Sequence, residues 1–536
     1  MPDSVSARIV ERAEGIPLFV EELSQVVLDV SKAPSERAIG DIPATLQSSL
    51  LARLDRLGAA KPIAQVASVL GREFSHEMLL LVLADRPDRR ADLDLERSLT
   101  ALTVAGLLTR GAEATVTYSF RHALLQDAAY QSLLKRTRRE LHARVVVVLR
   151  ARFPDRVEAQ PELAARHAEA AGMAADAIGF YERAAAQAEA RSAHEEALLH
   201  LNRALDVAAA EPAGVERDRW ELAVRQSMSG VLFRSRGWAV PESVAALERM
   251  RELSLATADR RSYAAAVLGL GLADYLAARF EPALARIQES IAVANEVDAT
   301  AIVVVALTVS ANIAYFQGRF RDAYEFADRV TALYVPEQHH REVVALAGDD
   351  SGVTAMGTKG WALFHLGYPG RGIACTDSAV AAATSLGHPF TLGQARLWAL
   401  AIRYDRGDDD LDGVATDLLL DCTAQKFPAF AGGAQAILGK VNGNPAVVLE
   451  GAMVAATTGS MVMAPSIGFC LADAHRQSGH LADALSAIDA ALEVAATTGQ
   501  VFYDAPLLTL KGETILADAA EPAEKRRSAA ESCFRR

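Results

Sequence analysis

Residues whose types could do chemistry are scattered along this sequence without the spacing that chemistry needs. His339 and His340 are adjacent, so on a helix their side chains would point about 100° apart. No third ligand follows them at the four-residue spacing of helical zinc sites, and we interpret them as part of a surface loop. Paired carboxylates such as Glu21 and Glu22 fall on different helix faces, and no GxSxG nucleophile turn is present.

The cysteines show no functional spacing either. They lie far apart, at Cys375, Cys422, Cys470 and Cys533. Without a CxxC pair, neither a disulfide framework nor a zinc site is indicated. We therefore expect no catalytic residue and no metal site in this chain, and we do not expect it to act as an enzyme by itself.

One segment has the glycine spacing of a phosphate-binding loop. Gly352 and Gly357 are five positions apart, as in GxxxxGK[ST], but the following residues 358–360 read Thr-Lys-Gly. The motif holds phosphate because its lysine and its backbone N–H groups surround the anion, and here the order of Lys and Thr is reversed. The segment also lies where we expect a helix to begin, so it predicts no nucleotide site.

Basic side chains cluster once, at Lys135, Arg136, Arg138, Arg139 and Arg144. Such a cluster beside a small helical module raises DNA binding as a possible function. However, the helix predicted at 95–105, which would have to enter a groove, carries Glu96 and Arg97 and little other charge. The whole chain has a net charge of -13. We interpret the cluster as a solvated helix face and expect no nucleic-acid partner, with a DNA-reading regulator as the alternative.

The composition indicates closely packed helices. Hydrophobic residues make up 51% of the chain but aromatic residues only 6%, and Ala and Leu dominate the rest. The longest apolar run, 301–316, contains Asn312 and is shorter than the roughly 20 residues that span a bilayer. It predicts one buried helix. The charged N-terminus does not resemble a signal peptide, so we expect a mainly α-helical, cytoplasmic chain with no membrane association.

Residues 42–155 are predicted to form a winged-helix-like module. Helices are indicated at 42–57, 62–70, 76–84 and 95–105, since Pro and Gly stand at helix ends. Two short strands follow at 107–110 and 115–120, with a turn at 111–114 between them. A further helix is predicted at 123–134. Helices followed by a two-stranded ribbon are typical of a winged helix.

Residues 156–536 are predicted to form an α-solenoid. A small residue, an apolar residue two positions later and an Ala three positions after that recur: Ala278, Phe280, Ala283; Gly318, Phe320, Ala323; Gly479, Leu481, Ala484. The first two copies are 40 residues apart. Each copy predicts the turn inside a helical hairpin, followed by the tightly packed second helix.

These offsets resemble those of the tetratricopeptide repeat, and the best match is Tyr181, Ala185, Ala188, Ala197, Leu201 and Ala204. A lone hairpin cannot bury its apolar face, whereas stacked hairpins bury a continuous one and leave a concave surface. We therefore expect a protein or peptide ligand on the solenoid.

Two further segments resemble the regulatory half of signal-transducing NTPases of the STAND class. GIPLFVEEL at 15–23 is similar to the GxP segment of their lid and places Pro17 where the family packs a proline on the adenine. YSFRHALLQD at 118–127 is similar to the winged-helix segment in which a histidine contacts the β-phosphate of ADP, and places His122 there. The acidic residue that follows in the family is Ala123 here. A proline-kinked helix start and a plain helix cap are the alternatives.

The order of these segments resembles one bacterial family, in which a class III adenylate or guanylate cyclase domain and a P-loop ATPase precede this region. The resemblance implies a lid remnant and linker at 1–41, the winged-helix-like module at 42–155 and the repeat array at 156–536. It implies no cofactor in this chain, and ATP or ADP only with the upstream ATPase domain. It also implies that the upstream ATPase and cyclase domains are partners.

The function that the resemblance implies is that of a non-catalytic regulatory region that senses a protein partner through its repeats. The last repeat, with Ala529 and Cys533 in register, has no capping helix after it, and we expect a fragment of a longer protein. A free-standing tetratricopeptide scaffold is the remaining alternative.

Overall fold

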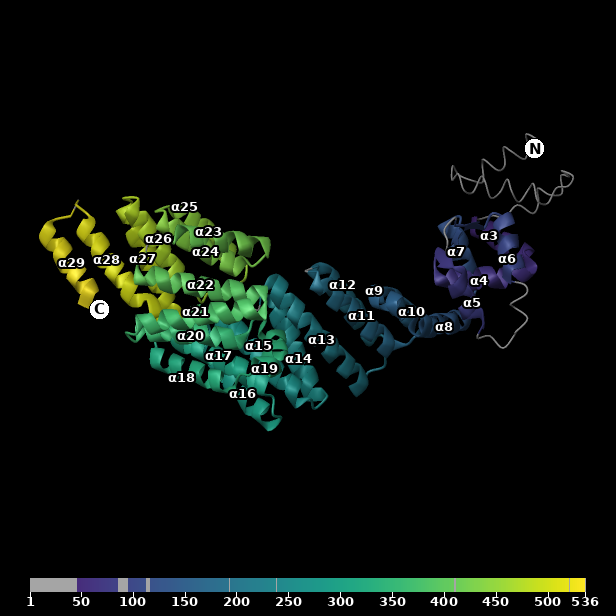
Figure 1. The fold of residues 1–536 in the computed structure, drawn as a ribbon, viewed down its shortest axis with the longest axis horizontal. Coiled ribbons are helices and arrows are strands. Elements are labelled where there is room, and N and C mark those ends of the chain that lie inside the picture. The colour runs from purple at the N-terminus through teal and green to yellow at the C-terminus, as the bar shows by residue number, and fades with distance from the viewer. Residues whose placement is uncertain are drawn as a thin grey trace, which may run out of the picture. The chain divides into compact units, whose positions relative to one another are not determined.

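The computed structural model describes residues 46–84, 95–111, 116–191, 193–237, 239–408, 411–519 and 521–535 (Figure 1). The chain divides into two compact units. The first unit consists of Met1–Gln187 and Asn202–Glu211, and the second consists of Ala188–Leu201 and Pro212–Arg536. Among the described residues, no helix combines the length and the hydropathy needed to cross a bilayer. The lid segment and its Pro17 lie outside the described residues.

The first unit begins with a small helical module that holds a three-stranded sheet. Its elements are α3 (Leu46–Arg56), η2 (Gly58–Ala60), α4 (Lys61–Leu70), β1 (Glu73–Ser75), α5 (His76–Ala84), α6 (Leu95–Val104), β2 (Leu108–Arg110) and β3 (Thr117–Phe120). The strands are antiparallel in the order β1-β3-β2, with Phe74 opposite Tyr118 and Leu108 opposite Phe120. The two-stranded ribbon is confirmed. The third strand, β1, was not predicted because three residues are too few to show alternation.

Five helices follow: α7 (Ala123–Gln131), α8 (Lys135–Arg152), α9 (Pro154–Ala159), α10 (Pro161–Ala171) and α11 (Ala174–Ala190). A buried polar chain joins α7, α8 and α10. The Tyr130 hydroxyl lies 2.9 Å from Nε2 of His142, and Nδ1 of His142 lies 2.9 Å from Nδ1 of His167. Burial lowers the pKa of His142 to about 4, with the charge of Arg138 adding to the effect. Burial and the neighbouring His142 lower the pKa of His167 to about 3.

After α12 (His194–Ala209), the second unit is an array of antiparallel helical hairpins. The pairs are α13 (Val215–Arg236) with α14 (Pro241–Ala256), α15 (Arg260–Leu276) with α16 (Phe280–Glu296), α17 (Thr300–Phe316) with α18 (Phe320–Leu333), α20 (Ser351–His365) with α21 (Pro369–Leu386), α22 (Pro389–Arg406) with α23 (Asp412–Ala424), α24 (Pro428–Val441) with α25 (Pro445–Ala456), α26 (Ala464–Gln477) with α27 (Leu481–Thr498), and α28 (Asp504–Ala517) with α29 (Ala523–Arg535). The helix α19 (Pro336–Ala347) and the short η3 (Val501–Tyr503) interrupt the alternation. The predicted mainly α fold with an α-solenoid is confirmed.

The turns inside the hairpins have the backbone that the small residues predicted. Ala278, Gly318 and Gly479 follow the first helices of their hairpins with φ of 56°, 70° and 79°. In each case the N–H of the residue that follows donates to the carbonyl oxygen of the residue five positions before it. An example is the N–H of Arg319, which donates to the Ala314 oxygen at 2.8 Å. This is a helix end closed by a left-handed residue, a position that favours Gly. The predicted hairpin turns are therefore confirmed.

Two hairpins close at glycine pairs. A Cβ added to Gly360 of α20 would lie 2.7 Å from the Gly372 oxygen of α21, and one added to Gly372 would lie 2.6 Å from the Gly360 oxygen. Gly432 of α24 and Gly451 of α25 approach each other in the same way. Because real Cβ atoms do not come this close to an oxygen, these crossings require glycine. The glycines therefore set the distance between the paired backbones.

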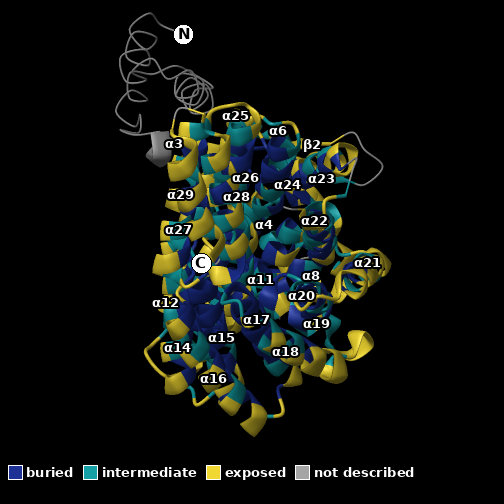
Figure 2. Cartoon of the chain, turned by 90° about the vertical axis from the view of Figure 1, so that its left-hand side faces the viewer, coloured by how far each residue is buried: buried dark blue, intermediate teal, exposed yellow. Residues whose placement is uncertain are grey.

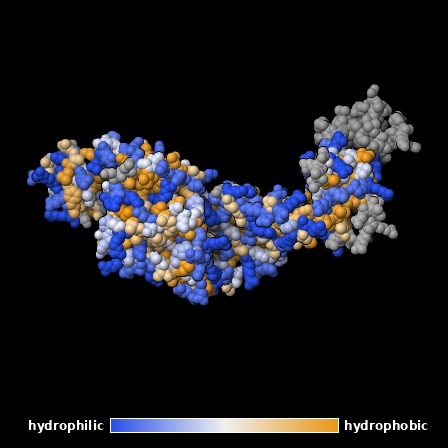
Figure 3. Space-filling view, viewed as in Figure 1, coloured by the Kyte–Doolittle hydropathy of each residue, from blue (hydrophilic) through white to orange (hydrophobic). Residues whose placement is uncertain are grey.

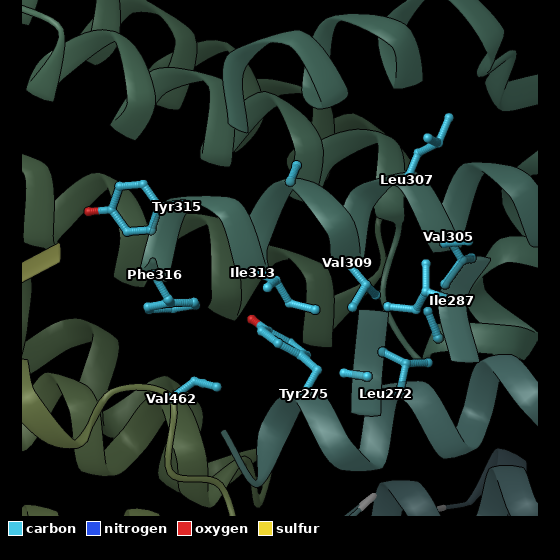
Figure 4. Packing of buried hydrophobic residues seen from close by; sticks show 14 of the residues in the cluster. Leu272, Tyr275, Ile287, Val305, Leu307, Val309, Ile313, Tyr315, Phe316 and Val462 are labelled. Carbon is cyan, nitrogen blue, oxygen red and sulfur yellow. The ribbon is translucent and has the colours of Figure 1, made fainter. Parts of the chain in front are cut away.

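The core of the solenoid surrounds α17. Its residues from Ala301 to Phe316, apart from the partly buried Val303, are buried, as predicted for the long apolar run. Figure 4 shows Val309 and Ile313 directed at Tyr275 of α15, with Val462 nearby from a distant part of the chain. In Figure 2, α15 and α17 are largely buried, whereas α14, α16 and α21 carry many exposed residues. In the α15–α16 and α17–α18 hairpins, the first helix is therefore the more buried one.

The glycine pair makes a prediction about stability. Replacing Gly360 by Val would press its side chain into the Gly372 backbone, so Gly360→Val should destabilise the second unit by about 1–3 kcal/mol. Gly370, with nothing within 4 Å of an added Cβ, is the matched control, and Gly370→Ala should be neutral or slightly stabilising. Chemical denaturation followed by circular dichroism measures both. Equal effects of the two substitutions would show that the crossing is not tight.

The histidine chain predicts acid sensitivity of the first unit. Both folded pKa values lie below the roughly 6.5 of an unfolded histidine, so the unfolded state binds more protons as the pH falls. The contribution to stability is complete above about pH 7 and is lost on acidification to pH 4.5, by about 2–4 kcal/mol for the pair. In the His167→Gln variant, amide hydrogen exchange of α8 and α10 should depend less on pH than in the wild type. An unchanged dependence would contradict the assignment.

Candidate ligand cavity on the inner face of the solenoid

The structure does not bring the two predicted nucleotide contacts into one described site. His122 stands at the N-cap of α7 with extended backbone, φ −134° and ψ 143°, but its side chain makes no capping hydrogen bond. Its Nε2 is buried without a hydrogen-bond partner. An unpaired buried ring nitrogen is uncommon in a folded protein. Its predicted role toward a nucleotide stays a prediction.

The glycine-spaced segment at 352–360 is helical. Gly352 and Gly357 lie within α20, where a Cβ on either residue would collide with the ring of Tyr334 or of Trp398. The predicted start of a helix there is confirmed.

The interpretation of His339 and His340 as a surface loop is wrong, because both lie on α19. Nδ1 of His340 lies 2.7 Å from Oδ2 of the fully buried Asp350, which caps α20.

The basic cluster lies on α8 and is partly engaged within the first unit. Arg138 donates to the Leu133 and Gln131 carbonyls at 3.0 and 3.1 Å, and its guanidinium lies 4.9 Å from the centre of the Tyr130 ring. Arg136 pairs with Glu140 at 2.9 Å on the same helix. Arg138 therefore closes the end of α7, and these contacts favour the interpretation as a helix face over DNA reading.

A cavity lined by aromatic residues lies on the inner face of the solenoid. This cavity, the larger of two described there, has a volume of about 490 Å³ and is bordered by α13, α15, α17, α20, α22, α24 and the segment 457–463. Its aromatic lining is Phe233, Tyr275, Phe316, Phe390, Trp398, Phe427 and Phe430. On the face drawn in Figure 3, hydrophobic and hydrophilic residues of the solenoid are interspersed.

A few polar groups converge on this larger cavity. Asp349, at the start of α20, accepts a hydrogen bond from the Thr354 hydroxyl. Thr358 donates to Oδ1 of Asn312 on α17 at 2.5 Å. Asp349 keeps a little accessible surface because it borders the cavity, but protein surrounds its carboxyl. This burial raises the pKa of Asp349 to about 6, the bond from Thr354 opposes the rise, and the charge of Asp350 adds to it.

A smaller cavity of about 370 Å³ adjoins the larger one. It lies among α22, α24, α25, α26 and α27, and the two share Leu397, Trp398, Ala429, Thr458, Ser460 and Met463. Its walls are almost entirely apolar, but Asp405 is present among them, and Oδ1 of Asp405 accepts from the Tyr503 hydroxyl at 2.5 Å. Asp405 has accessible surface toward this cavity, but the protein packed around its carboxyl group desolvates it and raises its pKa to about 6. Each cavity therefore has one partly desolvated carboxyl group at its wall.

The segment 457–463 forms part of the wall of both cavities. The N–H of Met461 donates to the Leu276 oxygen at the end of α15, at 2.7 Å, and Nε2 of Gln500 donates to the Met461 oxygen at 3.0 Å. Gly237, after α13, approaches the Thr458 oxygen so closely that an added Cβ would lie 2.6 Å from it. Late and early hairpins are thereby joined across the inner face. The two adjoining cavities on the inner face, which remain partly open, are called the chamber.

None of these cavity residues was predicted as a site. Asp349 and Asp405 look like ordinary acids near helix ends, and the segment 457–463 reads as a polar and apolar mixture without a motif. The one available signal was Asn312 inside the apolar run, because a buried amide needs a partner. Which residues meet in the chamber depends on the curvature of the array, which hairpin patterns do not encode.

Comparisons with known proteins leave the family open. No family model matches the chain. A curated but uncharacterized protein of Rhizobium meliloti (strain 1021) is 31% identical over 198 residues, which cover 36% of this chain and 19% of that protein. The matched region therefore spans about a fifth of the length of this relative.

Among solved structures, similarity extends to a Signal Transduction ATPase with Numerous Domains (STAND) protein with a tetratricopeptide repeat sensor from Pyrococcus horikoshii. It has a TM-score of 0.49 and 13% identity over 96% of this chain and 74% of that one. A Rap protein in complex with Competence and Sporulation Factor gives a TM-score of 0.40 and 13% identity over 63% of this chain and 98% of that one. Both scores are below 0.5, so the repeat fold rests on the hairpin geometry described above.

The buried carboxyl group predicts a stability cost at neutral pH. The folded pKa of Asp349, about 6, exceeds the roughly 3.9 of an unfolded aspartate, so ionising it above pH 6 disfavours the folded state. Asp349→Asn keeps an acceptor for Thr354 without the charge and should stabilise the second unit by about 1–3 kcal/mol at pH 8. The gain should shrink toward pH 4.5, where Asp349 is protonated when folded. Thermal melts at both pH values measure this, and a loss of stability at pH 8 would contradict it.

Proposed function

We propose that this chain is a non-catalytic regulatory and protein-interaction region of a signal-transducing ATPase, and that its inner chamber receives a segment of a peptide or protein partner. The observation that carries the proposal is the pair of adjoining cavities lined by aromatic and aliphatic side chains with few polar groups. Ligand sites in proteins typically combine such an apolar lining with a small number of convergent polar groups.

The size of the cavities defines the kind of ligand. Volumes of about 490 and 370 Å³ fall within the range of roughly 300–1,000 Å³ for small-ligand pockets and are far too small for a folded domain. They suit a few consecutive side chains of an extended segment. Met461 and Met463 border the smaller cavity and supply flexible side chains that adapt to different ligands.

The two carboxyl groups at the cavity walls define the polar preference. Asp349 and Asp405 are acceptors when ionised, and burial raises both pKa values to about 6. A cationic or N–H group of a ligand placed beside either carboxylate would offset the cost of burying the charge. The ligand is therefore an apolar segment with at least one donor or positive group. Energy held in an unfavourable buried charge is typical of binding sites.

The N-terminal module supplies the link to an ATPase in this proposal. The order α4, β1, α5, α6, β2, β3, with β1 paired to β3 at the sheet edge, supports its assignment as a winged helix. The unpaired Nε2 of His122 supports the nucleotide-facing role that the STAND resemblance implies. ATP or ADP would enter only with an ATPase domain, and a cyclase domain would be a further partner. The chain itself would neither hydrolyse ATP nor form a cyclic nucleotide.

Selection from a phage-displayed library of random peptides tests the chamber. Ala429 borders both cavities, so Ala429→Trp should fill the junction between them. Peptides selected on the wild type should bind the Ala429→Trp chain at least tenfold more weakly, as measured by fluorescence anisotropy. Leu255→Trp places the same side chain on α14, at a residue that is 58% exposed, and should leave binding unchanged.

Two outcomes would contradict the proposal. One is a selection that yields no peptide enriched over the bare support. The other is a set of peptides that bind both tryptophan variants as tightly as the wild type. Circular dichroism of the variants shows whether Ala429→Trp keeps its helical content, and Ala429→Leu is the smaller filling substitution if it does not.

A further inference from the structure

The hairpin turns of the solenoid bring three sequence positions together. At the α15–α16 turn, Nε of Arg279 donates to Oδ1 of Asp274, five residues earlier, at 2.8 Å. At the α17–α18 turn, Arg319 occupies the same position as Arg279 and pairs with Asp322, three residues later, at 2.8 Å. If i is the residue in the last turn of the first helix, the side chains at i, i+5 and i+8 are therefore neighbours. The side chain at i+5 can contact either the one at i or the one at i+8.

At the α26–α27 turn, all three positions carry residues that bind metals. They are His475 in the last turn of α26, His480 at the N-cap of α27 and Asp483 in its first turn. One ligand atom from each residue lies within 4.8 Å of those of the other two. Nδ1 of His475 is buried and has no hydrogen-bond partner in the described structure. The turn thus gathers two imidazoles and a carboxylate around one point.

The backbone holds this group in place. The N–H of His480 donates to the His475 oxygen at 2.9 Å, and the N–H of Ala484 donates to the His480 oxygen at 3.0 Å. Gly479 closes the turn with φ of 79°. The neighbouring positive charge of Arg476 is paired with Asp473 at 2.8 Å, which lowers its repulsion of a cation. The hydrogen-bonded backbone of the turn therefore fixes the positions from which the three side chains project.

We propose that His475, His480 and Asp483 bind a divalent transition-metal ion of the zinc class. Imidazole and carboxylate at about 2.0–2.2 Å are ligands of Zn²⁺, and three protein ligands leave a position for water. Calcium and magnesium prefer all-oxygen sites, so the two histidines exclude them. The ion would fasten the end of α26, a helix that borders the smaller cavity, to the start of α27. The sequence predicted no metal site because we looked for ligands four residues apart on one helix. Here the ligands come from two helices and the turn between them.

Co²⁺ titration of the tag-free full chain, followed by visible absorption, tests the site, with Zn²⁺ as competitor. The wild type should bind one ion per chain with a dissociation constant in the micromolar range or tighter, and Zn²⁺ should raise its melting temperature. His480→Ala and Asp483→Asn should each weaken binding about tenfold or more and abolish the thermal shift. His339→Ala and Glu493→Gln remove an imidazole and a carboxylate elsewhere in the second unit and should behave as the wild type.

Binding that is unchanged in His480→Ala and Asp483→Asn, or a wild type that shows no saturation below millimolar metal, would overturn the proposal. Both substituted residues are exposed, so the variants should fold, and circular dichroism without metal checks this. Peptide binding by the chamber is measured without metal. A chain that binds no metal would therefore not contradict the proposed peptide binding, and a chain that binds no peptide would not contradict the metal site.

Discussion

The close approach of paired helices at small residues is the contact on which the rest of the solenoid depends. At the Gly360–Gly372 crossing the two backbones touch, and a single Cβ would hold them apart. Such contacts let each hairpin pack as a thin layer, and the layers bury a continuous apolar face that no hairpin could bury alone. α17 lies at the centre of this stack with its residues from Ala301 to Phe316 almost wholly buried.

The curvature of the stack creates the chamber. Early and late hairpins meet through Met461, which bonds to Leu276, and through Gln500, which bonds to Met461. The inward helices therefore surround a space lined by aromatic side chains, and the segment 457–463 forms part of its wall. Asp349 and Asp405 are among the polar groups at its walls, and the desolvation that raises their pKa values is a cost to the folded state when they are ionised. Residues retained at such a cost are typical of binding sites.

Local patterns in the sequence predicted the helices of the N-terminal module, the buried helix at 301–316 and three hairpin turns, because small residues such as Ala278 and Gly318 occupy positions that each repeat needs by itself. The chamber could not be predicted in this way. It forms from residues far apart in the chain, such as Asp405 and Tyr503, and their meeting depends on the accumulated rotation of successive hairpins. The strand β1 was missed because it takes its stability from pairing with β3, not from its own three residues. The role of His122 stays a prediction.

Hydrogen exchange of the full chain with and without a selected peptide tests the central claim most directly, since it locates the ligand without a substitution. The account predicts slower exchange in the inward helices α15, α17, α20, α22 and α24 and in the segment 457–463, with little change in the outward helices α14, α16 and α21. Protection confined to the outward helices, or to the helices of the N-terminal module, would contradict it.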